Sequence, residues 1–441
     1  MNETTIGIIS LGCLIVLLMT GLPISSIFLV LSLVGLSLIL SFQNATGLVG
    51  AALYFNVASP NWAALPLFIL LGSLATHGGY AQKAFKGLNI ITKGLTGALG
   101  IATCYSCAFF GAMSGSPAAT AAIFAKLTLP EMRKYGYEKS FAAGIVACAG
   151  TFAAMIPPSG LMIVYALFTQ QSIGRLFAGG IVPGFITATV YAILIIIRIK
   201  INPKLVREEL YQAESHSVWA RIKAIKELWP AFLTATVVLG GIYSGVFTPT
   251  EAAAAGCALM FILGILQGSL RNLNTVKSAL RESSSTASMI FFIIITALFF
   301  SRYLAFTEIP IGLANWIAQL QVERIYVLIG ILSVWFFLGM IMIPDGIYAL
   351  CLPIFFPLIV KMGYDPIWFG IITIKLNEIA NVTPPVGLNI FTIQSAMGKD
   401  ITAEEMYVGV WPFVCCDIVV LILLMVFPGI VLWLPNLLLG R

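Results

Sequence analysis

Two segments of the sequence place adjacent prolines, hydroxyls and amides within stretches that are otherwise apolar. They are "AMIPPSGLMIV", residues 154–164, and "NVTPPVGLNIF", residues 381–391. A proline lacks a backbone donor and frees a carbonyl one turn earlier, so a double proline is expected to unwind a helix locally. Freed carbonyl oxygens can bind a cation, and the N-terminal amides of a restarting helix can bind an anion. Together the two segments indicate an ion-coupled transporter of an anionic solute.

Sodium is the cation that we expect at these sites, with hydroxyl and carbonyl oxygens as its ligands. The candidate ligands lie near a double proline or near one of two other helix-breaking sequences. In the first half of the chain they are Ser114, Gly115, Ser116, Gly150, Thr151 and Pro157, and in the second half Gly339, Asn381, Thr383 and Gly387. An alternative is that the Gly and Ser residues only allow helices to pack closely.

Ionisable side chains within apolar segments are costly and usually functional, which makes them candidates for binding the solute. The candidate solute-binding residues are Asp345, Lys375, Asn377, Glu378, Arg302 and Ser159. Two alternatives stay open. Lys375 and Glu378 are three residues apart on one expected helix and could simply neutralise each other. Arg302 could lie near the membrane interface and extend its charged group towards water.

No pattern in the sequence supports an enzyme. The eight cysteines lie within or beside apolar runs, and the two histidines, His77 and His216, stand apart from each other and from any metal-binding motif. Cys104 and Cys107 form a CxxC, but neither His nor a charged residue is close to them in sequence, so we interpret them as small buried apolar residues. We therefore expect neither catalytic residues nor a cofactor, with Na⁺ as the only metal.

Composition predicts the elements that must position these residues. Of 441 residues, 59% are hydrophobic and 10% are charged, whereas a soluble domain carries roughly 25% charge. The mean hydropathy is +1.00, and apolar runs long enough to cross a bilayer recur along the whole chain. We expect an all-α polytopic membrane protein in contact with lipid. The Lys and Arg residues concentrate in short loops, which suits a positive-inside bias better than binding of nucleic acid.

The chain contains an internal repeat at an offset of 227 positions. Residues 109–163 and 336–390 share sixteen identities over fifty-five positions without a gap, including both double prolines. Basic loops of one copy correspond to segments poor in Lys and Arg in the other, which predicts opposite orientations in the membrane. The expected divisions are a first inverted repeat over 1–197, a cytoplasmic amphipathic linker over 198–229 and a second inverted repeat over 230–441.

Each repeat is expected to contain one re-entrant helical hairpin and one broken helix. Basic segments 83–93 and 126–139 both suit the cytoplasmic side, so the apolar segment between them must enter and leave on that side. The predicted hairpins cover about 94–125, with its tip at 114–117, and about 326–359, with its tip at 342–346. The predicted broken helices cover about 140–168 and 367–395. Separately, Thr250 and Glu251 suit the start of the helix that follows them.

Six motifs in order resemble the large membrane subunit of TRAP transporters, the tripartite ATP-independent periplasmic transporters. The motifs are "GLPIS" (21–25), "PLFILLG" (66–72), "SGSPAATAA" (114–122), "YGYEKSFAAGIVACAGTFAAMIPPSGLMIVYA" (135–166), "TPTEAAA" (248–254) and "NEIANVTPPVGLNIF" (377–391). The resemblance covers essentially the whole chain.

This resemblance implies several further properties. They are Na⁺-coupled uptake of an organic acid of the sialic acid or C4-dicarboxylate class, an elevator mechanism with a scaffold and a transport domain, and a multi-pass location in the bacterial inner membrane. The implied partners are a small four-helix membrane subunit, here a separate chain, and a periplasmic binding protein. Many members have an acidic residue directly before the second hairpin's tip, where this chain has Ile343, with Asp345 two residues later. That shift weakly favours sialic acid.

Two other readings of the same sequence remain open. A stand-alone divalent-anion/Na⁺ symporter would share inverted repeats, paired hairpins and broken helices, and would differ by working without a binding protein. A channel is less well supported, because the two charged half-sites are inequivalent and no repeated pore-lining pattern is present.

Overall fold

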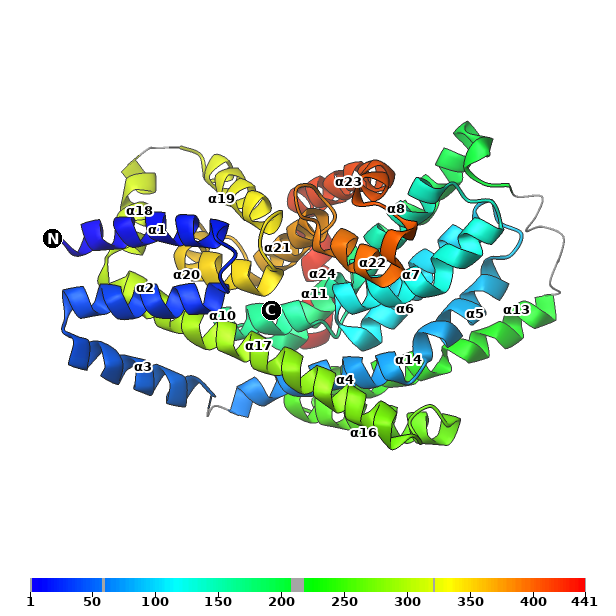
Figure 1. The fold of residues 1–441 in the computed structure, drawn as a ribbon, viewed down its shortest axis with the longest axis horizontal. Helices are drawn as coiled ribbons and strands as arrows, with labels where there is room; N and C mark the ends of the chain where they lie inside the picture. Colours follow the sequence, from blue (N-terminus) through cyan, green and yellow to red (C-terminus); the bar gives the residue numbers. More distant parts are fainter. Residues whose placement is uncertain (1, 58–59, 208–217, 320–321, 441) are drawn as a thin grey trace.

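The computed structural model describes residues 2–57, 60–207, 218–319 and 322–440, and within these ranges the regular structure consists of helices without any strand. The molecule is elongated, and many of its helices run roughly along its long axis (Figure 1). The N-terminus lies at one end of the long axis, whereas the C-terminal helix lies near the middle. The prediction of an all-helical protein is confirmed.

The first half of the chain forms a run of mostly apolar helices. They are α1 (Glu3–Met19), α2 (Ile24–Ile39), α3 (Phe42–Val57), η1 (Pro60–Ala63), α4 (Ala64–His77), α5 (Tyr80–Thr92), α6 (Ala98–Ser114), α7 (Pro117–Lys134), α8 (Lys139–Gly150), α9 (Phe152–Met155), α10 (Gly160–Thr169), α11 (Ile173–Ile201) and η2 (Pro203–Leu205).

The second half continues with α13 (Val218–Ile225), η3 (Lys226–Leu228), α14 (Trp229–Ala235), the π-helical η4 (Thr236–Gly240), α15 (Gly241–Tyr243), α16 (Pro249–Gln267), α17 (Leu273–Phe306), α18 (Ile309–Gln319), α19 (Arg324–Gly339), α20 (Pro344–Lys361), α21 (Pro366–Ala380), α22 (Leu388–Met397), η5 (Gly398–Asp400), α23 (Ala403–Val426) and α24 (Gly429–Leu439).

Six helical stretches are long and apolar enough to cross a membrane, or up to eight if each of two bent pairs counts as one span, among the residues that the structure describes. One bent pair joins residues 139–155 to α10 at an angle of 40°, and its break contains the first double proline. The other joins α4 to α5 at 63°, and sequence analysis did not identify it. The helix count supports a multi-pass membrane protein.

Helix boundaries follow the internal repeat of the sequence. α7 begins at Pro117 and α20 begins at Pro344, 227 positions later, and both helices contain 18 residues. α8 begins at Lys139 and α21 begins at Pro366, again 227 positions later. The similarity between the two halves therefore extends from residue identities to the positions at which helices start.

Three expected boundaries differ in the structure. α7 continues to Lys134, nine residues beyond the predicted end of its hairpin, because Arg133 and Lys134 suit the last turn of a helix as well as they suit a loop. The helix after the second hairpin tip already begins at Pro344, so Asp345 lies in its first turn. Thr248, and not Thr250, caps α16, because only Thr248 stands three residues before Glu251, the spacing of a capping box.

The predicted linker is described only in part. Residues 198–201 belong to the end of α11, and residues 208–217 lie outside the described ranges. The remaining described parts contain η2, α13, η3 and the first residue of α14, and within them Trp219 and Trp229 are 71% and 45% exposed. Exposed tryptophans are common at a membrane interface.

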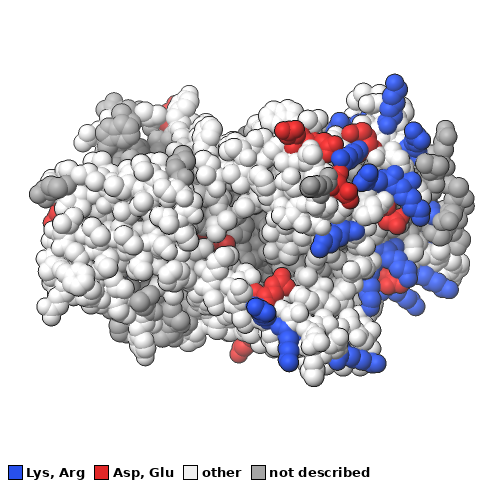
Figure 2. All heavy atoms as spheres, viewed as in Figure 1, with Lys and Arg blue, Asp and Glu red and all other residues white. Residues whose placement is uncertain are grey.

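Charged side chains are distributed unevenly along the molecule. On the face shown in Figure 2, Lys and Arg gather at the end where α5, α7 and α13 lie in Figure 1, and the opposite end shows almost none. This separation follows the long axis of the molecule, as expected if that axis crosses the membrane.

Glycines allow α8 and α23 to touch through their backbones. A Cβ atom added at Gly144 would lie 2.3 Å from the carbonyl oxygen of Gly409, and one added at Gly409 would lie 1.9 Å from the carbonyl oxygen of Ser140. Beside this contact, the Lys139 Nζ atom lies 2.8 Å from the Glu405 carboxylate. Lipid supplies no hydrophobic driving force for helices to associate, so close packing of this kind stabilises the contact between membrane helices.

We expect Gly409→Ala to separate α8 from α23 and to destabilise the protein by about 1–3 kcal/mol, the usual cost of overpacking. Thermal unfolding of the detergent-solubilised protein would measure this as a lower midpoint. Gly330→Ala on α19 is the matched control, since a Cβ atom at Gly330 would meet nothing within 4 Å. Equal midpoints for the two variants would contradict the importance of this contact.

Candidate functional site

The turn between α6 and α7 is wedged between the first double-proline break and α4. Gly115, at this turn, has a φ of +60°, and a Cβ atom there would lie 2.9 Å from the carbonyl oxygen of Pro158. On the other side, a Cβ atom at Gly72 of α4 would lie 2.1 Å from the carbonyl oxygen of Ser114. The hairpin tip and the broken helix, far apart in sequence, therefore meet through their backbones.

Some of the predicted sodium ligands of the first half already have their side-chain oxygens in hydrogen bonds within the protein. Ser114 and Thr120 share a hydrogen bond of 2.8 Å, Ser116 Oγ accepts from the Ala119 N–H, and the Thr151 hydroxyl donates to the Cys148 carbonyl. Gly150 packs against α7. Pro157 lies in the break itself, two residues before Ser159.

Ser159, which sequence analysis assigned to the solute, ends the first break. Its side chain is fully buried, and its Oγ atom forms no hydrogen bond with any described residue. A buried hydroxyl without a partner is uncommon and calls for an explanation, such as a missing ligand or water.

The second break runs from Asn381 to Gly387. Asn389 in the next helix donates its backbone N–H to the carbonyl of Asn381 at 3.1 Å, and the Thr383 hydroxyl donates to the Ile379 carbonyl at 2.6 Å. Gly387, with a φ of +60°, precedes the start of α22. The side-chain Oδ1 atom of Asn381 is buried and accepts no hydrogen bond within the described part of the chain.

The second hairpin tip lies beside α21, just before this break. A Cβ atom at Gly339 would lie 2.7 Å from the Cβ atom of Ala380. Asn377 accepts a hydrogen bond of 3.2 Å from Trp335 Nε1. Its Nδ2 atom and the buried Tyr348 hydroxyl interact with each other, but neither forms a hydrogen bond of full geometry with a described residue. Asp345 is partly buried in the first turn of α20, where a carboxylate interacts favourably with the helix dipole.

Lys375 and Glu378 belong to a buried cluster that joins three helices. Lys375 Nζ donates to Glu378 Oε2 at 2.9 Å, to Asp417 Oδ1 on α23 at 2.6 Å and to Thr187 Oγ1 on α11 at 3.2 Å. Tyr191 on α11 donates to Asp417 Oδ2 at 2.5 Å. Because an ammonium has three donors and all three are used, Lys375 has none left for a solute in this conformation.

Sequence analysis missed Asp417, Thr187 and Tyr191. The rule that identified Lys375 and Glu378 applies equally to Asp417, the one acidic residue within the otherwise apolar part of α23 after its first turn. Thr187 and Tyr191 gave no such signal, since hydroxyl-bearing side chains are common in membrane helices.

Arg302 is not part of this cluster. It is exposed on α17, a helix that packs mainly on α2 and α4. Its position suits the alternative in which the side chain extends along the protein surface towards water.

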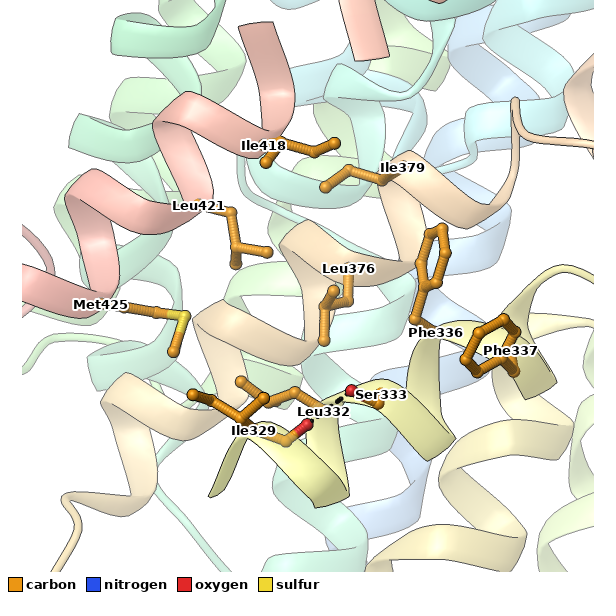
Figure 3. Close-up of a pocket in the computed structure, with 10 residues that line it drawn as sticks. All are labelled: Ile329, Leu332, Ser333, Phe336, Phe337, Leu376, Ile379, Ile418, Leu421 and Met425. Atoms are coloured by element: carbon orange, nitrogen blue, oxygen red, sulfur yellow. Dashed lines mark hydrogen bonds between the residues drawn. The ribbon is translucent and has the colours of Figure 1, made fainter. Parts of the chain in front are cut away.

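A cavity of about 340 Å³ lies between α19, α21 and α23. Figure 3 shows its lining by α19, α21 and α23, including Phe336, Leu376 and Leu421. The one hydroxyl in its wall, that of Ser333, already donates to the carbonyl of Ile329 at 2.8 Å. With no free polar group in the wall, this cavity does not suit an organic anion.

Nine buried polar side-chain atoms have no hydrogen-bond partner in the described part of the chain, and five of them lie at the two breaks or next to the second hairpin tip. The five are Ser159 Oγ, Tyr348 OH, Asn377 Nδ2, Glu378 Oε1 and Asn381 Oδ1. The other four, Ser106 Oγ, Arg175 Nε, Arg198 Nη1 and Tyr243 OH, lie elsewhere. The two halves also interlock here, because Asn389 Nδ2 donates to the carbonyl of Ala147 and the rings of Tyr165 and Tyr348 lie 5.9 Å apart. Hydroxyl, amide and carbonyl oxygens in this setting fit a desolvated sodium ion and a polar solute.

Comparison with solved structures supports a transporter fold. The YdaH transporter of Alcanivorax borkumensis superposes with a TM-score of 0.62 at 14% identity, covering 88% of this chain and 89% of that one. At this identity the likeness concerns the fold alone.

Sequence relatives are closer. The large permease protein of a C4-dicarboxylate TRAP transporter from Pseudomonas aeruginosa is 36% identical over 85% of this chain and 86% of its own length. Its counterpart from Rhodobacter capsulatus is 33% identical over 98% of this chain and 99% of its own length. A relative from Vibrio cholerae, 30% identical over 96% of this chain and 97% of its own, is a sialic acid TRAP transporter large permease protein.

The family described as "Tripartite ATP-independent periplasmic transporter, DctM component" matches residues 11–430, nearly the whole chain. The resemblance drawn from six motifs is thereby confirmed, and it places the protein among transporters rather than enzymes. This chain belongs to the family of large permease components of TRAP transporters.

Proposed function

We propose that this chain is the membrane-spanning path for Na⁺-coupled uptake of an organic acid into a bacterial cell. The observation that supports this most strongly is that five of the nine buried polar side-chain atoms without partners in the described structure lie at two helix breaks or next to a hairpin tip. Such atoms cost free energy unless a ligand or water satisfies them. A large permease of a TRAP system acts with partners, so we propose a small four-helix membrane subunit and a periplasmic binding protein for this one.

The sodium ion is proposed to bind near each hairpin tip, beside carbonyl oxygens and hydroxyls of the break. In the first half, the Pro158 carbonyl faces the tip at Gly115, and the Ser159 hydroxyl has no partner among the described residues. In the second half, Gly339 and Thr383 flank the corresponding site. These oxygens match a hard cation, and the N-termini of α10 and α22 would favour the solute's carboxylate.

We further propose that the two repeats have opposite orientations in the inner membrane. In Figure 1, α6 and α7 lie in one half of the view and α19 and α20 in the other, as hairpins entering from opposite sides would. The end of the molecule rich in Lys and Arg would face the cytoplasm. Movement of the hairpins and broken helices against the remaining spans, as in an elevator, would then expose the sites alternately to each side.

Among organic acids, a C4-dicarboxylate is the first candidate. The shifted acid at Asp345 weakly favours sialic acid, but relatives at 32–36% identity are named for C4-dicarboxylates, whereas those named for sialic acid are 28–30% identical. The stand-alone symporter remains the second candidate, because the fold alone does not require a binding protein.

Uptake into proteoliposomes tests this function. We expect this chain, reconstituted with its small subunit, to accumulate radiolabelled succinate only when both an inward Na⁺ gradient and the binding protein are present. Uptake of radiolabelled sialic acid is measured in parallel as the alternative substrate. Accumulation by this chain alone would contradict the tripartite function and favour a self-sufficient symporter.

Gly115→Ala tests the contact between the first tip and the first break. The variant pays about 1–2 kcal/mol for a positive φ and also places a Cβ atom 2.9 Å from the Pro158 carbonyl. We expect uptake to fall roughly tenfold or more, equivalent to about 1.4 kcal/mol of lost binding energy. Gly363→Ala is the control, because its φ of +79° is equally unsuited to alanine but its surroundings are open. Similar losses in both variants would show that the contact itself does not matter.

Ser159→Ala tests whether the unpartnered hydroxyl binds an ion. Removing a hydroxyl that has no hydrogen bond should leave the unfolding midpoint unchanged, while the Na⁺ concentration for half-maximal uptake rises several-fold. Ser106→Ala is the control, since its buried Oγ atom also has no partner within the described residues but stands in the middle of α6, about 12 Å from the tip along the helix. An unchanged Na⁺ dependence in Ser159→Ala would remove this residue from the site.

A further inference from the structure

The buried cluster around Lys375 contains an odd number of ionisable charges. It holds one ammonium and two carboxyl groups, those of Glu378 and Asp417, and all three side chains are at most 1% exposed. With both carboxyl groups ionised, the cluster would carry a net charge of −1. An unbalanced charge in a site of low dielectric is so costly that a group there generally becomes neutral instead.

Hydrogen bonding distinguishes the two carboxyl groups. Both oxygens of Asp417 accept a hydrogen bond, one from Lys375 at 2.6 Å and one from Tyr191 at 2.5 Å. Glu378 accepts at Oε2 from Lys375 at 2.9 Å, whereas its Oε1 atom is buried and has no partner in the described part of the protein. Donors at both oxygens favour the ionised form, so Asp417 is the better anion and Glu378 the better site for a proton.

No second cation balances the cluster from the helices around it. Tyr191 on α11, Cys148 on α8 and Tyr348 on α20 interact electrostatically with its members, and all three are neutral when protonated. The helices α9 and α24, which also pack on α21, contain no ionisable residue. On α19, the guanidinium of Arg324 stacks on Tyr364. On α10, the Tyr165 hydroxyl donates to the carbonyl of Pro366.

We propose that Glu378 binds a proton and is a neutral carboxylic acid in this conformation, which places a proton site at the centre of the permease between α11, α21 and α23. The proton comes from water and leaves to water, so no other reactant is needed. Glu378 follows Lys375 by one helical turn and precedes the second break by three residues. A neutral cluster next to the break lets this segment remain in the membrane without a counter-ion.

Infrared spectroscopy of the purified protein tests this directly, because a protonated carboxyl group has a carbonyl stretch, sensitive to H/D exchange, that a carboxylate lacks. We expect such a band in the wild type, its loss in Glu378→Gln, and its persistence in Glu308→Gln, which changes an exposed carboxyl group. Asp417→Asn should also abolish the band, because Glu378 then becomes the sole counter-charge of Lys375. If Glu378→Gln does not fold, the loss of the band in Asp417→Asn still assigns the band to this cluster, and Tyr191→Phe then decides which of the two carboxyl groups holds the proton.

Two further comparisons of variants exclude the other possible locations of the proton. Tyr191→Phe removes a donor to Asp417 only, so the band should stay at its position, and a shift would place the proton on Asp417. The single variants Glu378→Gln and Asp417→Asn each leave one positive and one negative charge, so only the double variant should show a large fall in unfolding midpoint. Absence of the band in the wild type would overturn the proposal, and a Na⁺-dependent carboxylate band in its place would show that a metal ion fills this role.

Discussion

A helix that stops inside a membrane leaves backbone groups whose hydrogen bonds lipid cannot satisfy. The architecture of this protein depends on which protein groups satisfy them instead. Both breaks lie against other protein segments. The carbonyl of Pro158 faces the glycine turn of a hairpin, and the Asn381 carbonyl accepts from the backbone of Asn389. Small residues at Gly72, Gly115 and Gly339 make these approaches possible. The irregular backbone of the first break is thus buried in protein. Pro384 and Pro385 of the second break are exposed, and there the carbonyls of Pro385 and Val386 accept from the Tyr407 hydroxyl. Backbone groups satisfied in these ways are the condition under which ion and solute sites can form at membrane depth.

The same constraint explains how far the sequence alone predicted the fold. Double prolines and glycine-rich turns are local signals, so the hairpin tips and broken helices could be located to within a few residues. Boundaries set by charge were less certain. The basic residues at the end of α7 suit either a loop or a final helical turn, and the capping residue of α16 depended on its spacing from Glu251.

The candidate site was predicted less completely, because its properties arise from tertiary contacts. Ser159 and Thr151 have similar side chains, yet only Ser159 is left without a partner in the described structure. Lys375 was an evident candidate for the solute, but its donors are used by Thr187 and Asp417, which come from helices distant in sequence. Residues that bind a ligand can thus be distinguished from residues that neutralise one another only when the hydrogen-bond partners of each side chain are known.

The opposite orientation of the two hairpins is the central claim, since alternating access by two related halves depends on it. Cysteine labelling with a membrane-impermeant maleimide, in a background free of the eight native cysteines, measures it directly. Lys134, at the end of α7, and Lys361, at the end of α20, occupy equivalent positions in the two hairpins. If the hairpins have opposite orientations, a cysteine at Lys361 reacts from the periplasm of intact cells, whereas one at Lys134 reacts only after lysis. Labelling of both from the same side would contradict opposite orientations.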